Sequence, residues 1–398
     1  MDLVVRRRES RPPGLQEIEV VERKGLGHPD TMCDGMAEEI SVRLCRYYLQ
    51  HFDRILHHNV DKVLLVGGAA RPSFGGGEIL EPIEIYLGGR ATEEYRGERI
   101  PIHEIAVDAS RDWLRRNVRG LDLERGVRII PRVRPGSADL VRLVASADTV
   151  PLANDTSYGT GFAPLTDLER VVLEVESALN APEAKRNNPE IGEDVKVMGV
   201  RRHARIDLTI ACAFVGRSVH DLDDYLRKKE RARELALDVA RRVTQCELDA
   251  TVNAADDAEH GSVFLTVTGT SAEGGDDGEV GRGNRACGLI TPYRAMSLEA
   301  AAGKNPVSHV GKLYNLAAPR VAAAIAAEIP HVTDAECVLV SQIGRVASDP
   351  KVADVCLAYE GHITVSAVRD RVMQIVRSEL GRLADLRDAL LSGRARVY

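Results

Sequence analysis

The residues most able to do chemistry lie in the stretch 269–285, which reads GTSAEGGDDGEVGRGNR. Its glycines allow a ligand to approach the backbone closely, and successive N–H groups in such loops can cradle an anion. Asp276 and Asp277 are hard oxygen ligands suited to magnesium, and Arg282 and Arg285 offer forked donors that match phosphate. The combination favours a site for a magnesium-bound polyphosphate over the alternative, a solvated acidic turn.

A second candidate is Lys304, in the segment 302–312, AGKNPVSHVGK. A P-loop requires G-x-x-x-x-G-K-[ST], whereas Leu298 stands at the first glycine position and Asn305 follows the lysine. The segment is therefore not a Walker A motif. Two interpretations of Lys304 remain open from the residues alone, a phosphate contact and an ordinary surface or capping lysine.

A third candidate is the segment 22–30, ERKGLGHPD, which stands just before a predicted helix. The N-terminus of a helix attracts phosphate, His28 can donate to phosphate oxygens, and Asp30 can hold a metal ion. The alternative is that Asp30 only caps the helix. The adjacent pair His57 and His58 is interpreted as structural, because neighbouring side chains on a strand point to opposite faces.

Composition limits the class of protein. A chain of 398 residues is expected to form more than one subdomain, and its net charge of −7 argues against a general nucleic-acid binder. There is no apolar run of about 20 residues for a membrane span and no signal-peptide pattern. The seven cysteines form no C-x-x-C pair, which predicts reduced thiols in a cytoplasmic protein and no zinc site.

Hydrophobic spacing predicts alternating strands and amphipathic helices without a regular βαβ period, and this favours repeated α+β layers over a doubly wound sheet. Thr166 and Glu169 form a predicted capping box at the start of one helix. We expect helices at 34–48, 105–118, 167–180, 219–246, 298–303 and 310–327, strands at 62–66, 82–87, 127–133, 194–200, 205–214, 262–268 and 335–342, and a final strand and helix within 363–391.

Together the three candidates resemble the S-adenosylmethionine synthetases (methionine adenosyltransferases), specifically their archaeal-type branch. The resemblance runs from about residue 20 to the C-terminal region, and so many long motifs in one order are highly specific. The matching segments are GLGHPD (25–30), VPLANDTS (150–157), GEDVKVMG (192–199), TVTGTSAEGGDDGEVGRGNR (266–285), LITPYR (289–294) and AAGKNPVSHVGKLYN (301–315).

The resemblance implies an α+β fold of three similar subdomains around a pseudo-threefold axis, with interleaved segments and approximate bounds 1–140, 141–260 and 261–398. It implies a homodimer, or a tetramer, with active sites between subunits, and the ions Mg²⁺ and K⁺. The implied reaction joins ATP and L-methionine: the sulfur attacks the ribose C5′ carbon, triphosphate leaves, and hydrolysis gives phosphate and diphosphate. Catalysis would then be largely positioning and electrostatic stabilisation, with no Ser or Cys nucleophile.

The resemblance also assigns roles to individual residues. Catalytic roles fall on His28, Lys196, Arg282 and Lys304, and metal binding falls on Asp30, with Asp277 and Glu22 as further candidates. The implied ATP contacts are Gly136, Ser137, Ala138, Asp139, Leu140, Val141, Asp194 and Asp276.

The chain departs from the bacterial and eukaryotic pattern at three places. Gly283 follows Arg282 where that pattern has lysine, His309-Val310-Gly311 replaces its Lys-x-Asp, and Ala69 replaces a glutamate of the methionine site. The second metal ligand therefore has two alternatives, Asp277 and Glu279. Two other classes of function remain open: another magnesium–ATP enzyme, such as a kinase or ligase, and a nucleotide-binding subunit without catalysis.

Overall fold

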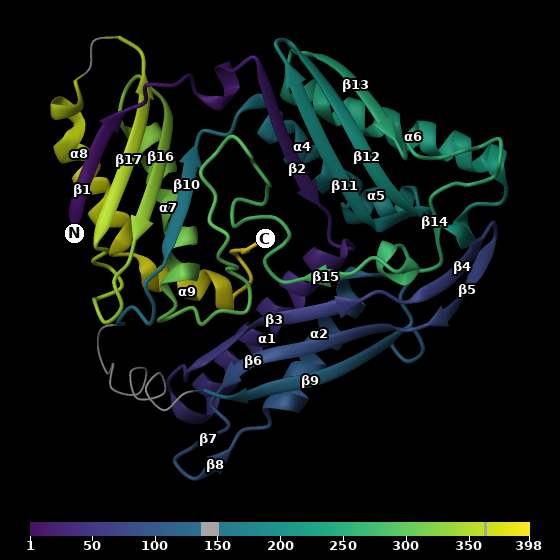
Figure 1. Cartoon of the computed structure of the whole chain (residues 1–398), viewed down its shortest axis with the longest axis horizontal. Coiled ribbons are helices and arrows are strands. Elements are labelled where there is room, and N and C mark those ends of the chain that lie inside the picture. Colours follow the sequence, from purple (N-terminus) through teal and green to yellow (C-terminus); the bar gives the residue numbers. More distant parts are fainter. Residues whose placement is uncertain (137–150, 362–363) are drawn as a thin grey trace.

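The computed structural model describes residues 1–136, 151–361 and 364–398. Within these residues, three main β-sheets surround an irregular central segment, and helices lie against one face of each sheet, behind the strands in the view of Figure 1. The mixed α+β class predicted from the sequence is confirmed. The predicted residues 137–141 of the ATP site lie outside the described part of the chain.

The first sheet has the order β15-β3-β6-β9 and is covered by α1 and α2 (Figure 1). Its strands are β3 (His58–Val66), β6 (Ile83–Ala91), β9 (Val127–Pro135) and the short β15 (Gly278–Glu279). Alternate residues of β3 are buried beneath the helices, as expected for a sheet with one covered face. The helices are α1 (Pro29–Phe52) and α2 (Ile102–Asn117).

The second sheet has the order β13-β12-β11-β2, and it contains the strand that the candidate site depends on most. The strands are β2 (Ile18–Lys24), β11 (Ile191–Arg202), β12 (Arg205–Val215) and β13 (Glu247–Val252), and β14 (Leu265–Thr266) pairs with β12. The helices α4 (Asp167–Leu179), α5 (Pro182–Asn187) and α6 (Leu222–Val243) accompany it. The capping box predicted at Thr166 and Glu169 is present at the start of α4.

The third sheet has the order β1-β17-β16-β10 and lies beside α7, α8 and α9 (Figure 1). It brings the first residues of the chain beside the last strand, because β1 pairs in parallel with β17. The bounds are β1 (Asp2–Arg7), β10 (Tyr158–Ala163), β16 (Val332–Val340), β17 (Val352–Tyr359), α7 (Val310–Glu328), α8 (Val365–Leu380) and α9 (Leu383–Leu391).

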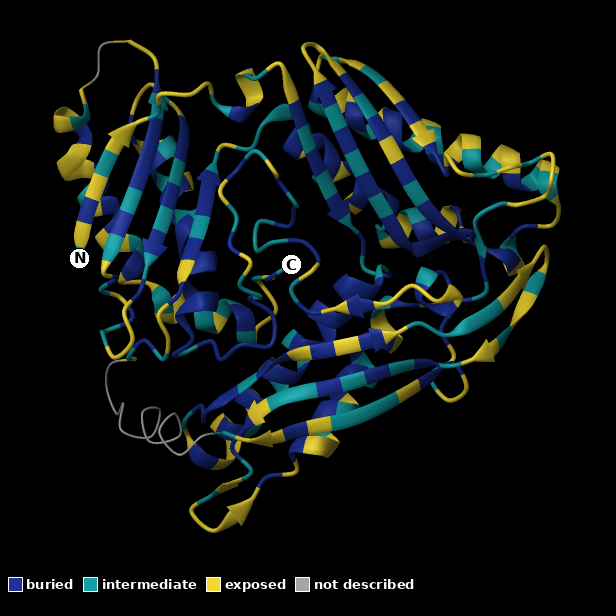
Figure 2. Cartoon of the chain, viewed as in Figure 1, coloured by how far each residue is buried: buried dark blue, intermediate teal, exposed yellow. Residues whose placement is uncertain are grey.

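Two hairpins extend from these sheets, β4 (Ala69–Ser73) with β5 (Gly76–Glu81), and β7 (Glu94–Tyr95) with β8 (Glu98–Arg99). Both hairpins and the outer side of α6 carry many of the exposed residues in Figure 2. The core is mainly aliphatic, as the composition predicts, and Trp113 is buried against Gly35, where any side chain would collide with the indole ring. In the described ranges no helix has the length and apolar character to cross a bilayer.

Several local predictions are wrong. Residues 298–303 are not helical, because their polar groups bond to other elements: Gly303 N–H donates to Glu38 and Glu299 accepts from Ser157. Tertiary contacts override the helix preference of this alanine-rich run. The strand predicted over 262–268 shrinks to β14, and the region 363–391 holds α8 and α9, whereas the last strand, β17, ends earlier, at Tyr359.

Candidate active site

The site begins with the loop between β2 and α1, which is fixed against β11. Gly25 N–H donates to the Val195 carbonyl over 2.8 Å, and Gly27 N–H donates to the Glu193 carbonyl over 2.9 Å. A side chain at Gly27 would collide with the backbone at Glu193 and Asp194, so this close approach requires glycine. Two motifs far apart in the sequence, 25–30 and 192–199, therefore form one unit.

His28 stands at the N-cap of α1, and this corrects the alternative in which Asp30 is the cap. Its Nδ1 accepts a hydrogen bond from Asp30 N–H over 3.2 Å. Burial lowers the pKa of His28, so the ring is neutral at pH 7. Because Nδ1 is the acceptor, the proton of the neutral ring is assigned to Nε2, which can donate to an incoming anion.

Asp30 ties the start of α1 to the glycine-rich segment. Its Oδ1 accepts from Glu279 N–H over 3.0 Å, and its Oδ2 pairs with Lys24 Nζ at 2.9 Å. One turn later, Asp34 Oδ1 accepts from Gly281 N–H over 2.9 Å, and burial raises the pKa of Asp34 to about 7. The segment containing Arg282 is therefore held directly over the helix start.

Asp194 and Lys196 both belong to β11, and the charges of both act on the ring of His28. Asp194 Oδ2 accepts from both the backbone N–H of Ser271, over 2.9 Å, and its hydroxyl, over 2.5 Å. Lys196 Nζ lies 3.2 Å from Glu22 Oε2 on neighbouring β2, and its side chain is 37% exposed. The lysine therefore keeps access to solvent.

The two arginines of the glycine-rich segment differ in what they bind. Arg285 donates to the carbonyl oxygens of Gly283 and Ser297, over 2.9 and 3.2 Å, and also to that of Gly281. It stabilises the loop, in contrast to the phosphate-binding role that the sequence favours for it. Arg282 is exposed, and within the described part of the chain its side chain makes no hydrogen bond or ion pair.

Asp276 and Asp277 are also exposed, at the end of this segment nearest β3. Asp277 Oδ1 accepts a hydrogen bond from Gly67 N–H over 2.9 Å. The backbone at Gly275 and Asp276 lies so close to Gly67 that a side chain at Gly67 would collide with it. We use the name open region for Glu22, His28, Asp30, Asp194, Lys196, Asp277 and Arg282, of which Asp30 and Asp194 are buried and the other five are partly or fully exposed.

Lys304 lies in a different environment. It is 2% exposed, and its ammonium group pairs with Asp61 and, at 2.8 Å, with Glu299. Lys312 is buried nearby and pairs with Glu38 Oε2 at 2.6 Å. We call these residues, Glu38, Asp61, Glu299, Lys304 and Lys312, the buried network. Among the described residues, none of the hydrogen bonds and ion pairs of Lys304 reaches the open region.

Sequence reasoning did not single out four residues that the structure places in these contacts. Lys24 and Ser271 hold members of the open region, and Asp61 and Glu299 hold Lys304. Lys24 and Ser271 lie within the chosen segments 22–30 and 269–285, and Lys24 shares the parity of Glu22, so alternation along β2 could have found it. Nothing local marks Asp61, because its partner is far away in the sequence.

The donor set fits magnesium rather than a metal held only by protein ligands. No group of three or more His, Cys, Asp or Glu side chains suited to a metal ion occurs within the described ranges. Magnesium usually takes only one or two protein carboxylates, with substrate phosphates and water completing its shell. Asp30 and Asp277 each retain lone pairs beside their single backbone contacts, so both can serve as such ligands.

Comparison with known proteins identifies the family. A profile described as S-adenosylmethionine synthetase (AdoMet synthetase) matches residues 1–394. The chain belongs to the S-adenosylmethionine synthetase family. It is 53% identical to the "Probable S-adenosylmethionine synthase" of Aquifex aeolicus over 373 residues, and this aligned region covers 93% of each chain. It is 48% identical over 402 residues to the "S-adenosylmethionine synthase" of Pyrobaculum aerophilum, which covers 100% of each.

A solved structure supports the fold. An "Unusual S-adenosylmethionine synthetase from Campylobacter jejuni" superposes with a TM-score of 0.59 at 15% sequence identity, covering 92% of this chain and 88% of that one. At this identity the likeness concerns the fold alone. The archaeal-type resemblance inferred from the motifs agrees with the relatives, several of which are archaeal enzymes.

Proposed function

We propose that the chain forms S-adenosylmethionine from ATP and L-methionine, with the open region as the binding site for the triphosphate. Membership of the family over nearly the whole chain supports the activity. The observation that carries the site is the junction of three motifs at one place: the loop 25–30, the strand β11 with Asp194 and Lys196, and the segment 276–282.

The residues of the open region suit a reaction in which a whole triphosphate leaves. The methionine sulfur forms a bond to the ribose C5′ carbon, and the C5′–O bond breaks, so negative charge develops on the departing phosphate oxygen. Neutral His28 offers Nε2–H to that charge, and Lys196 and Arg282 offer cationic donors with solvent access. Fixed donors aimed at a developing charge lower the barrier without reorganisation.

Asp194, Asp276 and the segment 136–141 remain the proposed ATP contacts, and Lys304 remains a proposed catalytic residue. Because the ammonium group of Lys304 is committed to Asp61 and Glu299, a direct phosphate contact requires exchange of at least one of these partners. The alternative is that Lys304 positions the loop that contains it. Turnover and stability of Lys304 variants distinguish the two roles, because a lost phosphate contact lowers turnover even where stability is restored.

Magnesium is the proposed metal cofactor, with Asp30 as its protein ligand and Asp277 and Glu22 as further candidates. Bound to the triphosphate, it would neutralise part of the charge of the leaving group. Potassium stays a prediction from the family, without residues assigned to it. A cytoplasmic location also stays a prediction, to which the seven free cysteines, five of them buried, conform.

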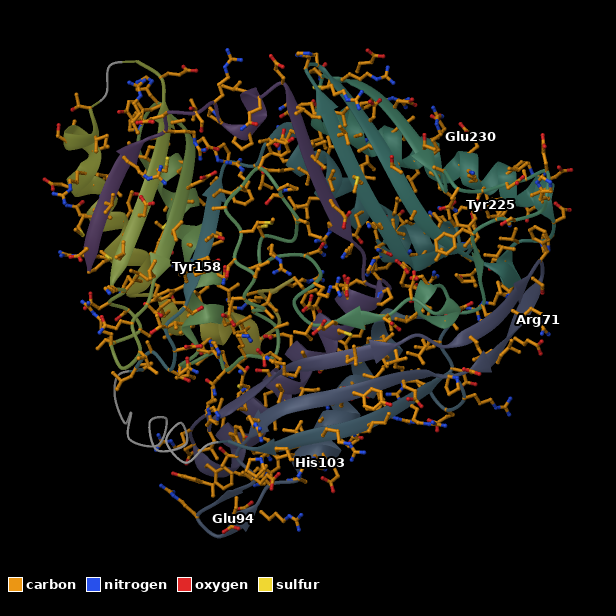
Figure 3. The ribbon with its side chains drawn as sticks, in the orientation of Figure 1. Arg71, Glu94, His103, Tyr158, Tyr225 and Glu230 are labelled. Atoms are coloured by element: carbon orange, nitrogen blue, oxygen red, sulfur yellow. The ribbon has the colours of Figure 1, made fainter. Side chains whose placement is uncertain are left out.

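A homodimer is supported by apolar residues on the sheet faces that helices do not cover. Leu64 and Val66 lie on one face of β3 and are 44% and 38% exposed, and Tyr158 on β10 is 42% exposed (Figure 3). Apolar side chains exposed on uncovered sheet faces are candidates for an interface, and most oligomers are symmetric dimers. The alternative assembly is a tetramer. We also propose that the three sheets of each chain represent three similar subdomains around a pseudo-threefold axis.

The activity is tested by incubating purified protein with ATP, L-methionine and MgCl₂ and identifying the products. We expect S-adenosylmethionine, phosphate and diphosphate, and no product when methionine or magnesium is omitted. ADP or AMP formed without a sulfonium product would overturn the proposal in favour of a kinase or ligase. Binding of ATP without turnover would indicate a nucleotide-binding subunit. Sedimentation of the same sample reports the assembly.

A further inference from the structure

A basic cleft lies on the reverse side of the loop that holds His28. The cleft has a volume of about 690 Å³, within the usual range for ligand sites. It is lined by the ends of α2 and α4, by α5, and by parts of β2, β11 and the C-terminal segment. The charged residues in its wall are Arg23, Arg116, Arg119, Lys185, Arg186, Arg396, Glu176 and Glu193.

The two carboxylates in the wall are already neutralised within it. Glu176 pairs with Arg23, and Glu193 pairs with Arg119. Arg116 pairs at 2.8 Å with Glu39, which is not one of the residues that line the cleft. Six basic and two acidic residues line the cleft, which leaves a local excess of positive charge in a chain whose net charge is −7. Such a local excess concentrates anions from solution.

Three cations in this wall have donors to spare. Arg186 and Arg396 are exposed, and their side chains make no hydrogen bond or ion pair with any residue that the structure describes. Lys185 is 5% exposed, and its ammonium group donates to the Gly192 carbonyl. An ammonium group has three N–H donors, so two remain. Burial lowers the pKa of Lys185 to about 8, which leaves the group mainly charged at pH 7.

The cleft and the open region are separate sites on opposite sides of one structural unit. Leu26 lines the cleft, whereas His28 belongs to the open region. Glu193 lines the cleft, whereas the next residue, Asp194, bonds to Ser271 in the open region. The strand β11 therefore contributes to both sites, through Glu193 to the cleft and through Asp194 to the open region.

We propose that this cleft is a second anion site that binds a small ligand carrying at least two phosphate groups. Arginine forks match phosphate oxygens two at a time, and the donors come from two elements of the wall, Lys185 and Arg186 from α5 and Arg396 from the C-terminal segment. Several separated phosphate groups can engage them together, which a single carboxylate cannot. The proposal adds a site to the enzyme proposed above and does not depend on its activity.

The test is a calorimetric titration of inorganic triphosphate into the full-length protein at low ionic strength. To fill the catalytic site first, the protein is saturated with MgCl₂ and the β,γ-imido analogue of ATP. We expect one further binding event per chain. The double variant Arg186→Glu/Arg396→Glu should weaken it at least about tenfold, because two charge-assisted contacts become repulsive. Arg186→Gln/Arg396→Gln should weaken it less.

The matched control is Arg231→Glu/Arg242→Glu, which makes the same change of charge at two exposed positions of α6 that lie outside the cleft. This control should bind triphosphate like the wild type. Absence of binding to the saturated wild-type protein at millimolar triphosphate would overturn the proposal, and so would equal affinity in the cleft variant. If the imido analogue itself fails to bind, the enzyme proposal is at fault, and the cleft is then tested on the free protein with the same variants.

Discussion

The open region and the buried network contain the same types of residue but use them differently. Lys196 has a side chain that is 37% exposed and one carboxylate neighbour at 3.2 Å, whereas Lys304 has a side chain that is 3% exposed and two carboxylate partners. A lysine with solvent access can exchange its partner for a phosphate group. A buried lysine whose charge balances buried carboxylates contributes first to the fold. The difference shows that a motif lysine can be found from sequence, but its availability depends on burial.

The largest expected effect concerns the buried network. Lys304→Met should lower the free energy of unfolding by about 3 kcal/mol, because the buried carboxylate of Asp61 then keeps only Lys62 Nζ, at 2.7 Å, as a cationic partner. Turnover should fall at least about tenfold as well. Denaturation with urea and steady-state kinetics measure the two effects.

The double variant Asp61→Asn/Lys304→Met provides the control for this prediction. Removing both charges should restore much of the lost stability, because the remaining partner of Lys304, Glu299, has a side chain that is 29% exposed and can be solvated. If Lys304→Met alone is as stable as the wild type, the description of the network is wrong. If stability is restored but turnover is not, Lys304 also contacts the substrate.

Variants of the open region should lose activity with little loss of stability. Lys196→Ala should reduce kcat/KM by about 10²–10³, the usual loss when one preorganised donor is removed from a developing charge, with little change in stability. Arg202→Ala, an exposed cation at the end of the same strand, is the matched control and should retain wild-type kinetics. Equal kinetic losses in both variants would contradict a specific role for Lys196.

The dependence of stability on pH sharpens the comparison further. Burial lowers the pKa of His309, which faces Lys304, Glu299 and Asp61, to about 4. The unfolded chain therefore binds more protons between pH 6.5 and 4, so this histidine contributes stability above pH 6.5 that is lost as the pH falls towards 4.

His309→Asn keeps a capping side chain for α7 and removes this titration. Between pH 6.5 and 5, the wild type should lose about 2 kcal/mol more unfolding free energy than the variant. The check is urea unfolding of both proteins at the two pH values. Identical losses would mean that His309 is not held neutral by burial.

The smallest effect is expected at Arg282. Arg282→Ala should reduce turnover about tenfold, because one exposed phosphate donor is lost, and should change stability by less than about 0.5 kcal/mol. Arg282→Lys should recover part of the activity because it restores the charge without the fork. A clear loss of stability in Arg282→Ala would show that this guanidinium group supports the loop, as Arg285 does.

The comparison also explains how far the sequence could predict the structure. The capping box at Thr166, the long helices and the strands β3, β6, β11 and β12 follow from local periodicity, and the structure confirms them. The site motifs were recognised because they are long and continuous. The strand β1 could not be predicted, because its pairing with β17 links residues more than 300 positions apart.

The predictions that fail at the site also depend on contacts between residues that no local sequence pattern specifies. The run 298–303 has helical composition, but its role is to present Glu299 to Lys304, a contact between side chains that no local pattern specifies. Arg282 and Arg285 are equivalent in sequence terms, and only the carbonyl oxygens around Arg285 show that its donors are already used. The roles of the site residues themselves stay predictions until the variants are measured.

The most direct test of the account asks whether the open region holds the triphosphate as a leaving group. The β,γ-imido analogue of ATP resists hydrolysis between its last two phosphates, yet its C5′–O bond is intact. Mixed with L-methionine, MgCl₂ and a stoichiometric amount of protein, it should give one S-adenosylmethionine per active site, detected by mass spectrometry. Failure of the analogue to give the sulfonium product, under conditions where ATP does, would contradict the account, because cleavage of a phosphate bond would then have to precede adenosyl transfer.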